Sequence, residues 1–193
     1  MFEALRSNIE KKVKLTDKEF EYCSTLFIQR KIRKHQFLLH EGDACKYLAF
    51  VTKGCMRQYT IDSKSEEHVV QFAIEDWWVT DQASYLTHEP ATYNIDALED
   101  SDVLLIDYPS REKLCETVPK FDRFFRLLLE NKYIATNKRI SATLSLSAEE
   151  QYLCMLDTYP NIVQRVPQNQ IASYLGITPQ SLSRIRKEMS EKK

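Results

Sequence analysis

The sequence predicts an α+β fold, in which an antiparallel β-roll of the barrel, sandwich or jelly-roll type is followed by a long helix and a carboxyl-terminal helix-turn-helix. Three observations predict it. Short strand-like runs alternate with turn residues between residues 31 and 108, an apolar helical stretch follows Pro119, and a two-helix pattern surrounds Gly176. A chain of 193 residues is long enough to bury a core in one large domain or in two modest ones.

The chain opens with helical patterns, which we expect to extend over residues 1–30. Phe2, Leu5 and Ile9 fall on one helical face, and Thr16 with Glu19 has the spacing of a capping box that starts a second helix. After residue 30 the period becomes that of strands, interrupted by turn sequences. The expected strands cover residues 37–39, 47–51, 56–60, 68–72 and 103–106. Short strands at this spacing favour an antiparallel barrel or sandwich.

A long helix is expected after Pro119, which suits a helix start, and it should run for roughly 20 to 25 residues. Its apolar surface is wider than one face, so the helix needs two apolar neighbours. We expect one side to pack on the barrel and one stripe to pair with a second copy of the chain. The stripe assigned to the dimer is Phe121, Phe125, Leu128, Lys132 and Ala135. The alternative is a helix buried within a monomer.

The helical carboxyl-terminal part begins after a stretch rich in Ser and Thr, residues 140–147, where we expect a hinge. Ser147 and Glu150 have the spacing of a capping box, which predicts a helix from Glu149 to Tyr159 with Leu153 and Leu156 facing inward.

A helix-turn-helix follows. Residues 170–175 predict a short helix, and Gly176 stands at the sharp turn, where a positive φ favours glycine. Thr178 suits the N-cap of the next helix and Pro179 its first position. That helix has one apolar stripe, formed by Leu182, Ile185 and Met189, and one polar stripe, formed by Gln180, Arg184 and Lys187.

Such a division of faces is what a DNA-reading helix needs, because one side packs on the preceding helix while arginine and amide groups meet base edges. An ordinary amphipathic helical hairpin has the same spacing. Local charge favours DNA, since the chain has a net charge of −1 but concentrates cations at this end. From residue 165 onward the cations are Arg165, Arg184, Arg186, Lys187, Lys192 and Lys193, against Glu188 and Glu191.

Composition argues against several other classes of protein. No apolar run approaches the roughly 20 residues needed to cross a bilayer. The first residues lack a secretory h-region, so we expect a cytoplasmic protein. The five cysteines and four histidines are scattered without a metal-binding spacing or a nearby nucleophile motif. We therefore expect no metal, no cofactor and no enzymatic activity.

The order of these parts resembles the Crp/Fnr regulators, the family of the bacterial cyclic-AMP receptor protein. Residues 40–57 resemble the start of that family's cyclic-nucleotide-binding β-roll, and residues 97–106 resemble its end. Each of the three glycines lies where the family pattern turns the chain. The resemblance implies a sensor domain over residues 1–110, a dimerisation helix and hinge over 111–145, and a DNA-binding domain over 146–193.

The phosphate-binding cassette departs from the family pattern, which is Gly-Asp-x-x-Gly-Glu followed by Arg-Ser/Thr-Ala. Here Glu75 and Val79 stand at the two glycines, Thr80 stands at the glutamate, and Ala91 best matches the arginine. A buried phosphate without a guanidinium would be uncompensated, at a cost on the order of several kcal/mol. We therefore expect no useful affinity for cAMP or cGMP. The cysteine cluster of the family's iron–sulfur branch is also absent from the amino-terminal segment.

Aromatic residues are abundant in the stretch that lines the family's pocket. The candidate effector residues are Trp77, Trp78, Asp81, Gln82, Tyr85, Thr92 and Tyr93. Aromatic walls with a few polar groups suit a small planar or apolar ligand that is not a nucleotide. The alternative is that these rings fill the barrel and leave a rigid scaffold without an effector.

The family's base-reading pattern, Ser/Thr-Arg-Glu-Thr-Val-x-Arg, corresponds to residues 178–184. Arg184 keeps the last arginine, whereas Pro179 replaces the first arginine and Gln180 the glutamate. We expect Arg184 to contact guanine and Gln180 to contact adenine. Further candidate contacts with DNA are Thr178, Ser181, Ser183, Arg186 and Lys187. Because the chain ends soon afterwards, we expect the family's β-hairpin wing to be absent or truncated.

The resemblance implies a homodimeric transcription regulator that presents two recognition helices to a near-palindromic operator of double-stranded DNA. A small non-nucleotide effector is a further candidate partner, and no membrane is expected. Two other classes stay open. One is a regulatory module whose helical head contacts protein rather than DNA. The other is a small enzyme on a cupin-like barrel, for which no suitable His/Glu constellation is present.

Overall fold

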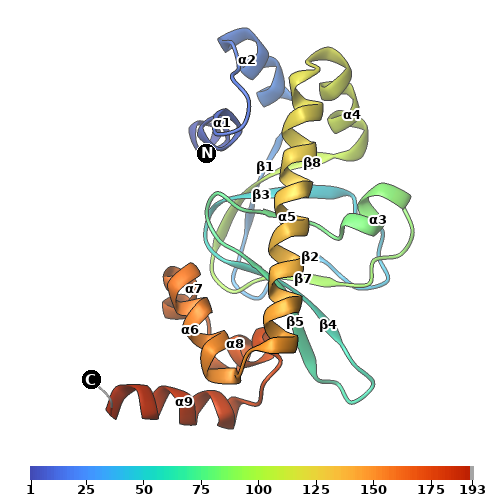
Figure 1. Cartoon of the computed structure of the whole chain (residues 1–193). Coiled ribbons are helices and arrows are strands. Elements are labelled where there is room, and N and C mark those ends of the chain that lie inside the picture. Colours follow the sequence, from blue (N-terminus) through green and yellow to red (C-terminus); the bar gives the residue numbers. More distant parts are fainter. Residues whose placement is uncertain (192–193) are drawn as a thin grey trace.

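The computed structural model describes residues 1–191 and consists of two antiparallel four-stranded sheets, a long helix that crosses them, and a small helical head at the carboxyl end (Figure 1). The predicted α+β class is confirmed. Lys192 and Lys193, which were counted in the basic carboxyl end, lie outside the described residues. Within residues 1–191, none of the helices combines the length and the apolar character that a membrane span requires.

The amino-terminal helices form as the sequence predicts, as α1 (Phe2–Glu10) and α2 (Asp17–Thr25). The capping box is present, because the Glu19 N–H donates to Thr16 Oγ1 at 3.3 Å and the Thr16 N–H donates to Glu19 Oε2 at 2.7 Å. The prediction that helical structure extends to residue 30 is wrong at its end, since the first strand starts at Ile28.

All five predicted strands are present, and the roll contains three more. The strands are β1 (Ile28–Ile32), β2 (Phe37–Leu39), β3 (Tyr47–Lys53), β4 (Met56–Ile61), β5 (Glu67–Ala73), β6 (Trp78–Val79), β7 (Asn94–Ala97) and β8 (Ser101–Asp107). One sheet has the order β1-β8-β3-β6 and the other β2-β7-β4-β5. The short helix α3 (Gln82–Thr87) links β6 to β7. Their antiparallel pairing confirms the predicted β-roll.

Gly54 forms the tight connection between β3 and β4. Its φ is +98°, and a Cβ at this position would lie 2.2 Å from Ser101 Oγ and 2.8 Å from the carbonyl oxygen of Asp100. Because no side chain fits there, the close approach of this turn to β8 depends on glycine.

Two helices follow the roll, α4 (Tyr108–Thr117) and α5 (Lys120–Ser145), so the expected domain boundary at residue 110 falls inside α4. The assignment of Phe121 and Phe125 to a dimer interface is wrong, because these rings are 0% and 4% exposed within their own chain's core. Leu128 also packs on that core. Lys132 and Ala135 face a cavity beside the roll.

The head contains α6 (Ala148–Thr158), α7 (Pro160–Arg165), α8 (Gln168–Leu175) and α9 (Pro179–Glu191). The predicted capping box of Ser147 and Glu150 is confirmed. Leu153, expected to face inward, is 44% exposed, whereas its neighbours Tyr152 and Met155 fill the head's core. Because α5 is helical through Ser145, only Leu146 and Ser147 of the residues 140–147 expected to form a hinge lie outside a helix.

Candidate nucleic-acid interface and sensor pocket

The helix-turn-helix has the local geometry that its sequence predicts. Gly176 closes α8 with a φ of +69°. The Ser181 N–H donates to Thr178 Oγ1 at 3.1 Å, which caps α9. Leu182 and Ile185 are 0% and 6% exposed and join the head's core. This packing leaves the opposite side of α9 facing solvent at the end of the molecule (Figure 1).

The exposed side of α9 brings four of the predicted DNA-contacting residues together. A shallow surface hollow is lined by Pro179, Gln180, Ser183, Arg184 and Lys187. We call this set the reading face. The Arg184 side chain is 76% exposed, and its closest carboxylate, that of Glu188, is 3.9 Å away. The carboxylates of Glu188 and Glu191 lie 3.9 Å from Arg184 and Lys187. Because such exposed pairs are weak, the reading face can bind phosphates or base edges at little cost in free energy.

The other predicted DNA contacts are less free. The hydroxyls of Thr178 and Ser181 lie 2.9 Å apart and serve the cap of α9. Arg186 is half-buried beside the reading face. These three residues support or flank the reading face.

A second face of the head is docked on the β-roll, where Arg165 of the head pairs with two carboxylates of the roll. Arg165 donates from Nη1 to Glu75 Oε2 and from Nη2 to Glu99 Oε2, both at 2.7 Å. These bonds raise the pKa of the Arg165 guanidinium, chiefly through Glu99 and Glu75. Sequence reasoning counted Arg165 with the DNA-binding charge, but its carboxylates come from distant segments of the roll.

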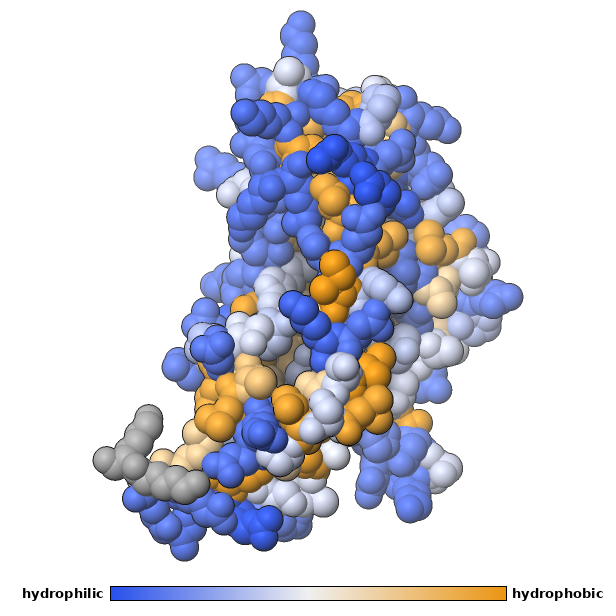
Figure 2. Space-filling model, viewed as in Figure 1, coloured by the Kyte–Doolittle hydropathy of each residue, from blue (hydrophilic) through white to orange (hydrophobic). Residues whose placement is uncertain are grey.

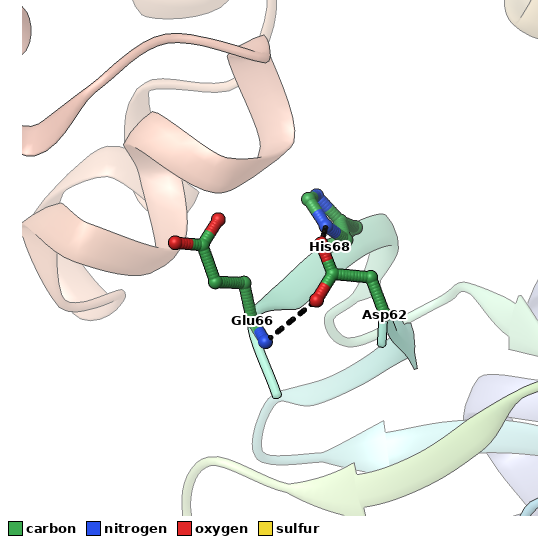
Figure 3. A group of neighbouring side chains, drawn as sticks. All are labelled: Asp62, Glu66 and His68. Carbon is green, nitrogen blue, oxygen red and sulfur yellow. Dashed lines mark hydrogen bonds and ion pairs between the residues drawn. The ribbon is translucent and has the colours of Figure 1, made fainter. Parts of the chain in front are cut away.

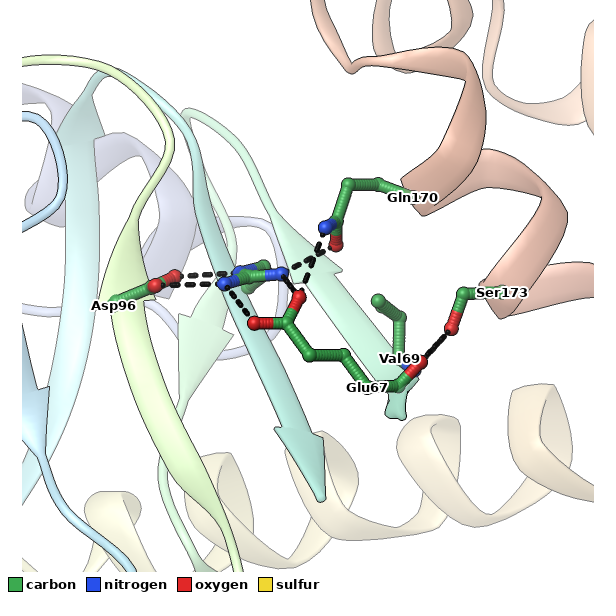
Figure 4. Close-up of polar contacts among 6 residues, drawn as sticks. Glu67, Val69, Asp96, Gln170 and Ser173 are labelled. Carbon is green, nitrogen blue, oxygen red and sulfur yellow. Dashed lines mark hydrogen bonds and ion pairs between the residues drawn. The ribbon is translucent and has the colours of Figure 1, made fainter. Parts of the chain in front are cut away.

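The same docking face includes a polar cluster on β4, β5 and β7 (Figure 4). Arg57 is 7% exposed and donates from Nε and Nη2 to the two oxygens of Asp96, at 2.8 Å and 3.0 Å. It also pairs with Glu67 and donates to Gln170 Oε1 of α8 at 2.6 Å. Ser173 donates to the Glu67 carbonyl at 2.7 Å. The first helix of the helix-turn-helix is therefore fixed on the hairpin of the roll.

A cavity of about 1070 Å³ runs along α5 between the roll and the head, and all seven predicted effector residues line it. Figure 2 shows this side of the molecule, with apolar patches gathered along the long helix. Trp78 and Tyr85 are 8% and 1% exposed and belong to the core, so they fill the barrel in part. Asp81 caps α3 and accepts a hydrogen bond from the Thr92 N–H. These side chains do not fill the cavity, which keeps room for a small ligand.

The residues that differ from the family's phosphate-binding cassette have structural roles in the roll. Glu75 accepts hydrogen bonds from Arg165 and from the Gly54 N–H, at 2.7 Å each. Thr80 donates to the Tyr47 carbonyl at 3.0 Å, and Ala91 is 4% exposed. Arg57 does not line the cavity. The roll therefore supplies the cavity with no guanidinium of its own.

One cluster of potential metal ligands lies in the turn between β4 and β5, formed by Asp62, Glu66 and His68 (Figure 3). Asp62 Oδ1 accepts from the N–H groups of Lys64 and Glu66, and Asp62 Oδ2 lies 3.0 Å from His68 Nε2. These bonds stabilise the β4–β5 turn, which explains why the three side chains lie together.

Comparisons with known proteins agree with this architecture. Residues 29–118 match the family described as the cyclic nucleotide-binding domain. The regulatory protein HlyX of Actinobacillus pleuropneumoniae is 23% identical over 187 residues, which cover 89% of this chain and 75% of HlyX. The fumarate and nitrate reduction regulatory protein of Vibrio cholerae is 25% identical over 183 residues, which cover 89% and 72% of the two chains.

Solved structures share the fold. FixK2 from Bradyrhizobium japonicum superposes with a TM-score of 0.73 at 17% identity, covering 86% of this chain and 85% of that one. A transcriptional regulator of the Crp/Fnr family from Eubacterium rectale gives a TM-score of 0.69 at 16% identity, covering 92% and 85%.

Proposed function

The chain belongs to the Crp/Fnr family of transcriptional regulators, and on that premise we propose that it binds a near-palindromic DNA operator as a homodimer. The observation that carries the proposal is the reading face of α9, where Gln180, Ser183, Arg184 and Lys187 lie together and exposed. Arg184 is suited to a bidentate contact with guanine and Gln180 to one with adenine.

The dimer would form along a flank of α5 that differs from the stripe expected from the sequence. Leu129, Tyr133, Ile140 and Leu144 are 39%, 69%, 49% and 82% exposed, and their spacing places them on one side of the helix. An exposed apolar stripe of this length on a long helix suits a paired helix from a second copy. We expect Tyr133→Glu with Ile140→Glu to sediment as a monomer and Arg123→Glu, which lies outside this stripe, to remain a dimer.

The roll with its cavity would be the sensor. The cavity leaves room for a small non-nucleotide effector, and the segment that replaces the phosphate cassette lacks a cation for a cyclic phosphate. We expect titration calorimetry with cAMP and with cGMP to give no binding. A micromolar or tighter dissociation constant for either nucleotide would contradict this part of the proposal.

The decisive experiment for DNA binding uses the full chain and a random-sequence duplex at low salt, followed by selection from a randomised duplex pool. We expect binding that weakens steeply with salt. We also expect selected sites with two half-sites centred about 34 Å apart, one helical turn. Absence of any binding at low salt would favour a head that contacts protein instead.

A further inference from the structure

The long helix brings unpaired positive charge to the cavity. Lys132 and Arg139 are seven residues apart, so they lie on the same face of α5, and both line the cavity. Among the ion pairs within residues 1–191, none includes either side chain. Burial lowers the pKa of Lys132. The nearby Asp81 carboxylate opposes this shift but forms no ion pair with Lys132, so the half-buried ammonium can still accept an anion from outside the chain.

Positive groups predominate along the whole cavity. Its basic lining residues are Lys12, Arg111, Lys132, Lys138 and Arg139, and its acidic ones are Asp76 and Asp81. Both acids are already engaged. Asp76 Oδ2 lies 2.8 Å from Lys11 Nζ, and Asp81 accepts hydrogen bonds from the N–H groups of Ser84 and Thr92. The charge of the cavity therefore favours a negative occupant.

Aromatic rings also line the cavity, and they come from two parts of the molecule. Trp77 of the roll meets Tyr159 of the head edge-on, with ring centroids 5.2 Å apart. Phe72 of β5 lies 5.3 Å from the Tyr174 ring of α8. The guanidinium of Arg139 lies over that same tyrosine at 4.8 Å. Flat aromatic walls beside a stacked guanidinium suit a planar ligand.

We propose that the cavity binds an elongated planar dianion, with one anionic group at Lys132, the other at Arg139 and an aromatic body between them. This inference rests on the sensor role proposed above. Seven residues of helix rise place the two cations about 10 Å apart along the axis, which sets the spacing of the anionic groups. Ala135, which lines the cavity between the two cations, leaves room for the body. A ligand that contacts roll, long helix and head together would favour the docked setting of the head.

The test is titration calorimetry of the full chain with three matched probes: biphenyl-4,4′-dicarboxylate, biphenyl-4-carboxylate and biphenyl-4,4′-dicarboxamide. We expect the dicarboxylate to bind, the monocarboxylate to bind about tenfold more weakly or worse, and the neutral diamide to bind weakest. Lys132→Gln and Arg139→Gln should each weaken the dicarboxylate by about tenfold. Arg123→Gln, on the opposite side of α5, should leave it unchanged.

Three results would overturn the inference: no binding of the dicarboxylate, equal binding of all three probes, or variants of Lys132 and Arg139 that bind like the original chain. Thermal unfolding of each variant checks that it is folded. Binding of the random duplex is measured on the same samples. A chain that binds duplex but not the dicarboxylate loses only this inference, whereas a chain that fails to bind duplex loses the proposed function.

Discussion

The head has two polar faces, and they differ in how their arginines are satisfied. On the docking face, Arg165 is held by two glutamates at 2.7 Å each. On the reading face, Arg184 is 76% exposed, with its closest carboxylate 3.9 Å away. Counting charged residues in the sequence does not distinguish these two arginines. The difference teaches that a cation bound by the fold's own carboxylates is structural, while one without such partners is available to a ligand.

The largest expected effect comes from breaking the docking face at its most buried point. Arg57→Ala leaves Asp96, which is 4% exposed, without its cation, and we expect a loss of about 3 to 5 kcal/mol in the free energy of unfolding. Urea unfolding measures it. The double variant with Asp96→Asn should recover part of the loss, because the unpaired charge is gone. A loss in the single variant below about 1 kcal/mol would show that water solvates Asp96.

On the reading face, Arg184→Ala should leave stability unchanged and weaken a selected operator by about 1 to 3 kcal/mol, with relaxed preference at one base position. Operator titrations with single-base variants measure both. Arg184→Lys is the matched control, since it restores the charge without the bidentate fork. An unchanged footprint and preference would remove Arg184 from base reading.

The docking face should also loosen in acid. Hydrogen bonds from Arg57 lower the pKa of Glu67 below its ordinary 4.5. Burial acts to raise the pKa of Glu75, but the hydrogen bonds from Arg165 and from backbone N–H groups outweigh it, so that pKa is lowered too. Lowered carboxylate pKa values mean that docking is fully stabilised above about pH 5 and is lost as the pH falls through them.

The emission of Trp77, which contacts Tyr159 of the head, should therefore shift to the red on acidification. The effect is modest, because both carboxylates are partly exposed. Arg165→Met should reduce the change, and an equal shift in that variant would assign it to another group.

The smallest expected effect is at the rim of the reading face. Lys187→Ala should reduce the salt dependence of duplex binding by about 0.9 in the slope of log affinity against log salt, with no change in base preference. Binding to random and selected duplexes across a salt series measures it. An equal slope in the variant would place Lys187 away from phosphate.

Local signals predicted much of the fold. Thr16 with Glu19, Ser147 with Glu150 and the glycine after α8 are read from spacing alone, because each depends on residues close in the chain. β7 was missed because Asn94 and Asp96 interrupt its apolar pattern, although both are buried and hydrogen-bonded.

Contacts between residues far apart in the chain could not be predicted from the sequence. Nothing local indicates that Arg165 meets Glu75 across 90 residues. Periodicity also could not decide which apolar stripe of α5 meets the roll, so Phe121 was assigned to the wrong neighbour. Lys132 was likewise assigned to the dimer stripe, because no local signal places it with Arg139 beside the cavity.

The junction between α5 and α6 is very short. Leu146 (φ −103°, ψ 147°) and Ser147 (φ −63°, ψ 160°) are the two extended residues between Ser145 and Ala148. Any reorientation of the head must therefore occur through the few backbone torsions of these residues. The capping box of Ser147 and Glu150 further restricts them at the start of α6. Such a joint allows a small set of discrete swivel positions, so a regulator built on it should switch between orientations and not drift through a continuum.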